Sequence, residues 1–151
     1  MGCLDPDPRP PVEPTQLPLA FARSLVAIAT AAKDVLRMEC LEALMHLAVL
    51  DPRSCAVVGG FRVLFDAVLD PNTRALNNPI LYAIIRTLND AESRAFVRPH
   101  LDLRKLLAPF TDLDSPLTER LQRVEASLHA FVVLMRSCAG LYFLTRFVSK
   151  F

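Results

Sequence analysis

The chain has 151 residues, of which 52% are hydrophobic and 22% are charged. A chain of this length and apolar content can bury a core without metal or disulfide support, which excludes intrinsic disorder for most of it. Seventeen Lys and Arg residues against sixteen Asp and Glu leave a formal net charge of +1, so no global field points to nucleic acid or to an anionic membrane.

The first 18 residues differ in composition from the rest of the chain. They hold six of the twelve prolines and several acids, where a secretory signal would need a basic start and an apolar run. We predict a proline-rich flexible leader over residues 1–18 and one helical domain over residues 19–151. The four cysteines form no CxxC pair, which indicates a reduced, cytoplasmic protein.

From Leu19 onward apolar residues recur at helical spacing, and no stretch alternates like a strand. The longest strongly apolar run, residues 130–135, is far shorter than the roughly 18 residues of a membrane span. The predicted helices cover residues 19–32, 34–50, 52–58, 61–69, the region around 81–88, 92–97, 101–107, 116–138 and a last segment to 151.

Local motifs set the predicted boundaries. Asp34 is expected to cap the second helix, and Asp51-Pro52 to end it and begin the third. Gly59-Gly60 predicts a helix stop, and Asp70-Pro71 a second one. Gly140 is expected to break the long helix near its end.

The long helix carries an apolar stripe at spacings of three and four residues. Its members are Leu121, Val124, Leu128, Phe131 and Met135. Such a stripe is typical of an amphipathic helix.

The succession of short and long helices predicts an all-α fold of the armadillo or HEAT type, an α-solenoid segment. The block over residues 47–70 has a short helix, a glycine pair and an apolar helix, as such a repeat does. In a repeat of this kind neighbouring helices must cover the apolar positions that one repeat cannot bury.

No motif in the chain predicts catalysis, a metal site or a cofactor. The glycines do not form a phosphate-binding loop, and His46, His100 and His129 are scattered. Glu39 and Glu42 lie one turn apart, which is typical of the solvated face of a helix. We therefore predict that the chain is not an enzyme and binds no cofactor.

Two stretches of the sequence are rich in Lys and Arg and are considered as contacts with a partner. Arg94, Arg98, Arg104 and Lys105 are interspersed with acids, which favours internal pairing. The last 16 residues are basic and aromatic, so they form either a segment that contacts a membrane surface or a partner, or a terminal helix packed on a neighbouring repeat. The sequence predicts no nucleic-acid partner and no membrane span, and leaves peripheral membrane contact open.

One segment resembles a known family. Residues 94–112, RAFVRPHLDLRKLLAPFTD, look like the segment that marks the N-terminal region of the Rictor family, and the blocks at 51–70, 80–90 and 123–145 follow the family order. The resemblance spans about residues 34–145. It implies a non-catalytic helical scaffold that supports assembly and substrate choice of the second target of rapamycin complex, with that kinase and the other subunits as partners.

Within this segment, Pro99 and Pro109 are expected to fix helix ends and Asp102 to cap the helix that follows. Phe110 is expected to anchor a turn in apolar surroundings, and Asp112 or Asp114 to satisfy backbone donors before the long helix. We interpret the segment first as a structural joint and second as a partner contact. The candidate site residues are Arg94, Arg98, Pro99, Asp102, Leu103, Pro109, Phe110, Thr111 and Asp112.

The alternative function is a generic armadillo-like adaptor that binds an unrelated peptide or helix along its concave face. The sequence leaves open which surface binds a partner, the oligomeric state, and whether the basic aromatic tail contacts lipid or a further repeat.

Overall fold

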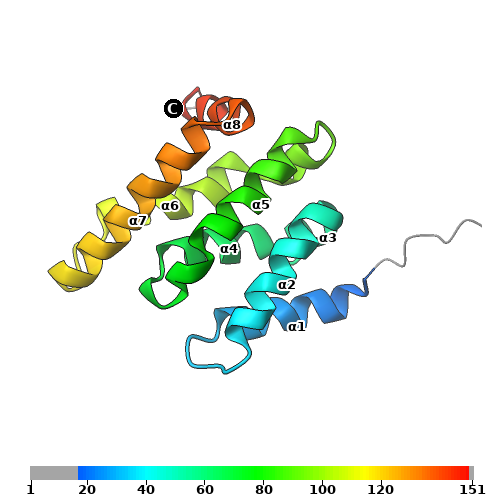
Figure 1. Cartoon of the computed structure of the whole chain (residues 1–151), viewed down its shortest axis with the longest axis horizontal. Coiled ribbons are helices and arrows are strands. Elements are labelled where there is room, and N and C mark those ends of the chain that lie inside the picture. Colours follow the sequence, from blue (N-terminus) through cyan, green and yellow to red (C-terminus); the bar gives the residue numbers. More distant parts are fainter. Residues whose placement is uncertain (1–16, 150–151) are drawn as a thin grey trace, which may run out of the picture.

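The computed structural model describes residues 17–149, so nearly all of the predicted leader lies outside the described residues. Within them every regular element is a helix, which confirms the all-α prediction (Figure 1). The α-helices are α1 (Leu19–Thr30), α2 (Arg37–Leu50), α3 (Pro52–Val57), α4 (Gly60–Leu69), α5 (Asn77–Asn89), α6 (Arg104–Thr111), α7 (Leu117–Met135) and α8 (Cys138–Val148). Three short helical turns join them: η1 (Pro71–Leu76), η2 (Ser93–Phe96) and η3 (Pro99–Leu103).

The predicted boundaries around α3 are confirmed. The Asp51 side chain accepts the backbone N–H of Ser54 over 3.2 Å and thereby caps the helix that Pro52 begins. Gly59 adopts a φ of +77°, the left-handed conformation that favours glycine at a helix end. Both boundaries depend on local chemistry, which is why the sequence reveals them.

Two predicted boundaries are wrong. Asp34 accepts the N–H of Leu36 over 2.8 Å and closes the turn before α2, which begins only at Arg37. Gly140 lies inside α8, and the chain breaks earlier, at Ser137, whose hydroxyl accepts the N–H of Gly140 over 2.9 Å. A Cβ at Gly140 would lie 2.2 Å from the Leu134 carbonyl oxygen, so this glycine permits close packing of the two helices.

The core is centred on α4, which packs against α2, α5, α6 and α7. Phe61, Leu64 and Phe65 on α4 are at most 1% exposed, and Ile80 and Ile84 on α5 are fully buried. Figure 1 shows α2, α5 and α7 running side by side, with α1 at one end of the row and α7 at the other. Helices α2 and α5 therefore pack both against α4 and against each other.

Helix α7 leaves part of its apolar stripe exposed, while Val124 and Phe131 are half-buried and Phe131 packs against the core. Leu121 is 57% exposed and Leu128 is 53% exposed. The adjoining face packs inward, since Ser127, Ala130 and Leu134 are fully buried and the Ser127 hydroxyl donates a hydrogen bond to the Leu106 carbonyl. Four large apolar side chains of α7, Leu117, Leu121, Leu128 and Met135, are thus at least half exposed.

Candidate functional site

The signature segment, residues 94–112, forms η2, η3 and α6 and packs against α4, α7 and α8. Leu103 and Leu106 are fully buried and join it to the core. Pro99 is the first residue of η3, as expected for a proline that begins a helical turn. Pro109 lies inside α6, two residues before its end at Thr111, so the expectation that it ends the helix is wrong.

Asp102 is a buried carboxylate that stabilises the turn before it. Its Oδ2 accepts the backbone N–H of Arg98 over 2.7 Å, and its Oδ1 lies 3.9 Å from the Nε of Arg62 on α4. Burial raises the pKa of the Asp102 carboxyl, while the Arg98 N–H and the two arginine charges oppose that rise. The predicted capping of the following helix is wrong, because the side chain reaches back by four residues instead of forward.

Asp112 organises the loop before α7, as predicted. Its carboxylate accepts the backbone N–H groups of Asp114 and Ser115 and the Ser115 hydroxyl, and it pairs with Arg123 on α7 over 3.1 Å. The Ser115 hydroxyl, these N–H groups and the Arg123 guanidinium hold the pKa of the Asp112 carboxyl below its usual range. Thr111 ends α6 and donates its hydroxyl to the Ala108 carbonyl over 3.2 Å.

Phe110 is 44% exposed, so the expectation that it anchors a turn in apolar surroundings is wrong. Helix α6 buries Leu106 and Pro109, and the neighbouring position on the helix turns outward. Arg98 is also exposed. Among the candidate site residues, Arg98, Phe110 and Thr111 are thus the exposed ones, and Arg98 and Phe110 have the largest side chains available to a partner.

The C-terminal helix packs on the signature segment. Arg94 and Arg146 lie over the Tyr142 ring at 5.8 and 5.7 Å from its centre, and the His100 and Phe147 rings are 5.7 Å apart. Phe147 is 8% exposed. The C-terminal helix thus packs on this chain through Phe143 and Phe147, while Leu141, Tyr142 and Val148 are exposed.

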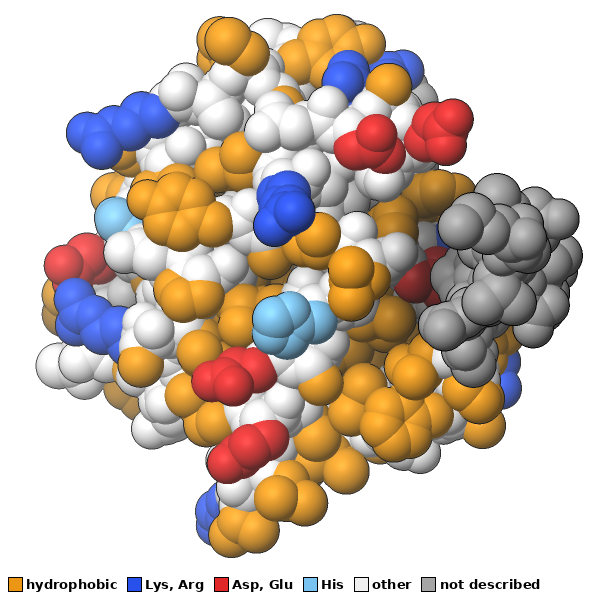
Figure 2. Space-filling view, turned by 45° about the vertical axis from the view of Figure 1, so that its right-hand side comes forward, with side chains coloured by type: hydrophobic (Ala, Val, Ile, Leu, Met, Phe, Trp, Pro, Cys, Tyr) orange, Lys and Arg blue, Asp and Glu red, His pale blue; other side chains and the backbone are white. Residues whose placement is uncertain are grey.

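The basic cluster is partly paired. Lys105 lies 3.2 Å from Asp66 on α4, and Arg94 donates to the Asn89 carbonyl over 3.4 Å. On the face drawn in Figure 2, Lys and Arg side chains are interleaved with acidic and hydrophobic ones and form no continuous basic patch.

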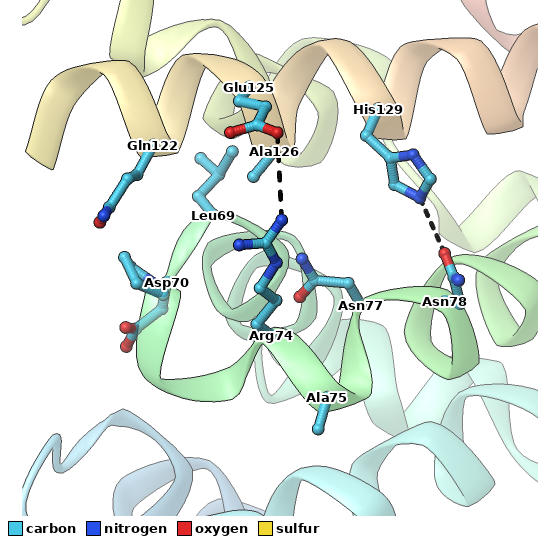
Figure 3. A pocket seen from close by; sticks show the side chains of 11 residues that line it. Leu69, Asp70, Arg74, Ala75, Asn77, Asn78, Gln122, Glu125, Ala126 and His129 are labelled. Carbon is cyan, nitrogen blue, oxygen red and sulfur yellow. Dashed lines mark hydrogen bonds and ion pairs between the residues drawn. The ribbon is translucent and has the colours of Figure 1, made fainter.

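A groove that the sequence did not predict lies between η1, the start of α5 and α7 (Figure 3). Its volume is about 300 Å³. Arg74 faces Glu125 across it at 3.9 Å, and His129 hydrogen-bonds the Asn78 side chain over 2.8 Å. These pairs join α7 to η1 and α5, and no serine, threonine, cysteine or lysine is among the described residues that line the groove. The groove unites positions about 50 residues apart, so no local motif could have revealed it.

The remaining residues considered for catalysis or metal binding do not come together in one site. His46, Glu39 and Glu42 are all exposed on α2. Burial raises the pKa of Cys55 to about 12, with contributions from Asp102 and Asp51, so its thiol is unreactive at neutral pH. Among residues 17–149 no group of three metal-ligating side chains comes together.

In the part of the chain that the structure describes, no single helix is both long and apolar enough to cross a membrane. Only α7 and α8 taken together pass such a test, and they are bent by 114°.

Comparison with known proteins identifies the family. Residues 9–148 match the family model described as rapamycin-insensitive companion of mTOR, N-terminal part. The chain is 36% identical over 96 residues to Protein pianissimo A of Dictyostelium discoideum, which covers 64% of this chain and 8% of that protein. It is 28% identical over 143 residues to the mouse rapamycin-insensitive companion of mTOR, covering 86% of this chain and 8% of the relative.

A third relative is the Target of rapamycin complex 2 subunit ste20 of Schizosaccharomyces pombe, 27% identical over 131 residues. That match covers 80% of this chain and 10% of the yeast protein. The chain thus spans a tenth or less of the length of these three relatives. Because the family model covers almost the whole chain, the chain belongs to the Rictor family and corresponds to its N-terminal region.

Proposed function

We propose that the chain is a non-catalytic scaffold segment of target of rapamycin complex 2, working in the cytoplasm and supporting complex assembly and the choice of substrates. The observation that carries the proposal is the match, over 80% of this chain, to a protein named as a subunit of that complex. The match to the mouse companion of mTOR, over 86% of the chain, supports the same assignment.

The contacts of the acidic side chains support a structural role. Asp102 and Asp112 bind backbone N–H groups and arginines, and Asp70 pairs with Arg37 over 2.7 Å. Each carboxylate stabilises a turn or joins two elements, which is what a scaffold requires of its polar residues.

The order of the helices supports an armadillo-like solenoid. Along the row α1 packs on α2, α2 on α5 and α5 on α7, and α7 keeps part of its apolar face toward solvent. A helical repeat has these features, because each unit covers its neighbour and leaves its own last face for the next unit.

The partner contact is proposed at the exposed part of the signature segment, Arg98 and Phe110. The test is affinity purification of the tagged chain from its own cells, with mass spectrometry of the proteins recovered. A signature variant carries Arg98→Glu and Phe110→Ser. Its matched control carries Arg23→Glu and Phe21→Ser on α1, where Phe21 is 53% exposed and Arg23 is exposed.

The proposal predicts that the target of rapamycin kinase and other complex 2 subunits are recovered with the natural chain and the control variant, and are lost with the signature variant. Recovery of unrelated partners without the kinase would contradict it and favour the generic adaptor. Loss with both variants would contradict the placement of the contact at Arg98 and Phe110.

A further inference from the structure

The groove between η1, the start of α5 and α7 continues into a second hollow toward the start of α7. This hollow has a volume of about 350 Å³ and shares Leu69, Asp70 and Pro71 with the groove. The wall that α7 forms along both runs from Glu119 to His129. At a rise of 1.5 Å per residue the wall is about 15 Å long, which is the span of about four to five residues of an extended chain.

The side chains that form this wall lie on one face of α7. Glu119, Gln122, Ala126 and His129 follow one another at intervals of three, four and three residues. Figure 3 shows Gln122 and His129 extending from α7 toward the opposite wall, with Glu125 between them. A row of mostly polar side chains therefore lies along the groove.

Two amide side chains in the groove have hydrogen-bonding groups without a partner. The Oδ1 of Asn77 is buried and accepts no hydrogen bond from the described residues, which costs free energy unless another donor reaches it. Within the part of the chain that the structure describes, the Gln122 carboxamide also makes no hydrogen bond, although it can both donate and accept. The groove therefore fits a ligand that carries N–H donors and carbonyl acceptors close together.

A weak ion pair crosses the groove beside Asn77. In Figure 3 the Arg74 side chain rises next to the Asn77 carboxamide toward Glu125, and the two charged groups are 3.9 Å apart. Their side chains are 78% and 73% exposed, so the pair contributes little to stability and can open when a ligand enters. Its opening moves the Arg74 side chain away from the Asn77 carboxamide.

The width of the groove excludes a helix as its occupant. The hydrogen bond from His129 to Asn78 joins the two walls over 2.8 Å, whereas a helix with its side chains is about 10 to 12 Å in diameter. A further helical unit can pack over the outside of the molecule but cannot enter the groove. An extended chain is narrower, and each of its residues carries one N–H and one carbonyl.

The charges of the groove disfavour a phosphate group. The carboxylates of Glu119 and Glu125 line its walls and repel an anion. Two of the lining arginines are already paired, Arg37 with Asp70 over 2.7 Å and Arg123 with Asp112 over 3.1 Å. The uncharged amides of a peptide backbone suit these walls better than a nucleotide or a phosphorylated side chain does.

We propose that the groove between η1 and α7 binds a peptide segment of a partner protein in an extended conformation, mainly through its backbone amides. Asn77 accepts an N–H of the peptide, and the Gln122 carboxamide pairs with the N–H and the carbonyl of another peptide unit. Residues 94–112 do not line the groove, so this site is separate from the proposed contact with the kinase, and the two proposals can fail separately.

The test uses a library of random short peptides displayed on phage and selected on the immobilised full chain. The affinity of a selected peptide, made by synthesis, is measured by fluorescence anisotropy. Asn77→Leu and Gln122→Met keep the size of the side chain but remove its amide, and each is expected to weaken binding about tenfold. Asn89→Leu, at the exposed far end of α5, is the matched control and is expected to bind like the natural chain.

Circular dichroism confirms that each variant remains helical. A library that yields no binding peptide would overturn the proposal. A selected peptide that the natural chain and both groove variants bind equally well would overturn it too, because its site would lie elsewhere.

Methylation of the peptide nitrogens tests whether the backbone is recognised. N-methylation at the residues that face Asn77 and Gln122 removes an N–H donor and is expected to weaken binding about tenfold, more than alanine at the same positions. The side-chain amide NMR signals of Asn77 and Gln122 are expected to shift when the peptide is added, and that of Asn89 to stay. The signature variant, Arg98→Glu with Phe110→Ser, is expected to bind the peptide normally. Binding that tolerates N-methylation at every position would overturn the backbone mode.

Discussion

The guanidinium of Arg37, the first residue of α2, lies 2.7 Å from the carboxylate of Asp70, where α4 ends. Their side chains are only 12% and 22% exposed. Arg37 also donates to the Ala29 carbonyl in α1 over 3.1 Å, and Asp70 accepts the N–H of Asn72 in η1 over 2.9 Å. One partly buried ion pair thus joins the ends of four helical elements.

This pair predicts a pH dependence of stability. Burial alone would raise the pKa of Asp70, but hydrogen bonds from Asn72 and Arg37 outweigh it and hold the pKa below its usual value. A lowered native pKa contributes stability that is present above the unfolded pKa and is lost as pH falls through the native pKa. We expect Asp70→Asn to cost about 1 to 3 kcal/mol at neutral pH and to approach the natural chain in acid.

Urea unfolding across pH checks this expectation. Asp66→Asn is a suitable control, because the Asp66 side chain is 49% exposed in its pair with Lys105. A cost for Asp70→Asn that stays constant from neutral to acid pH would contradict the role assigned to the ionised carboxylate.

The contribution of Asp102 to stability is expected to change with pH in the opposite direction to that of Asp70. Burial raises its native pKa, so its contribution is present below the unfolded pKa and is lost as pH rises through the native value. Asp102→Asn keeps an acceptor for the Arg98 N–H without a buried charge and is expected to stay within about 1 kcal/mol of the natural chain at neutral pH. Asp102→Ala is expected to cost about 1 to 3 kcal/mol. If Asp102→Asn and Asp102→Ala lowered the free energy of unfolding in denaturant by the same amount, the charge facing Arg62 would matter more than the hydrogen bond.

The two phenylalanines Phe110 and Phe65 are expected to differ sharply. Phe110 is 44% exposed, so Phe110→Ala should cost less than about 1.5 kcal/mol. Phe65 is fully buried, and Phe65→Ala should cost about 3 to 5 kcal/mol. The free energies of unfolding in guanidinium chloride provide the comparison, and similar costs for both would contradict the outward orientation of Phe110.

The two glycines at the start of α4, Gly59 and Gly60, are each required for a different reason. Gly59 has a φ of +77° and open space around it, so Gly59→Ala is expected to cost about 1 kcal/mol through backbone strain alone. At Gly60 an added Cβ would lie 2.6 Å from the Cys55 sulfur, so Gly60→Ala is expected to cost about 1 to 3 kcal/mol through overpacking.

A double-mutant cycle separates the two causes. Cys55→Ala removes the sulfur and is expected to reduce the cost of Gly60→Ala while leaving that of Gly59→Ala unchanged. If the cost of Gly60→Ala were the same in both backgrounds, the contact with Cys55 would not be its cause.

Features governed by neighbouring residues could be predicted from the sequence. The cap at Asp51, the stop at Gly59 and the loop organised by Asp112 each depend on bonds within a few residues. The signature segment could be predicted for the same reason, because its residues are contiguous in the sequence, and the family match supports it.

Features that depend on the whole chain could not be predicted. Periodicity identifies the apolar stripe of α7 but does not say which face the core covers, and here the core covers the small residues around Ser127 and Ala130. The packing of η3 and α6 against α4 decides that Asp102 accepts the N–H of Arg98 behind it and that Phe110 is exposed. The groove between Arg74 and His129 exists only because α7 returns to η1 and α5.

The proposed contact with the kinase is tested most directly by binding of the purified chain to the purified target of rapamycin kinase, measured with the chain immobilised and the kinase titrated. We expect saturable binding that the control variant, Arg23→Glu with Phe21→Ser, keeps and the signature variant, Arg98→Glu with Phe110→Ser, loses. No binding by the natural chain, or equal binding by both variants, would contradict it.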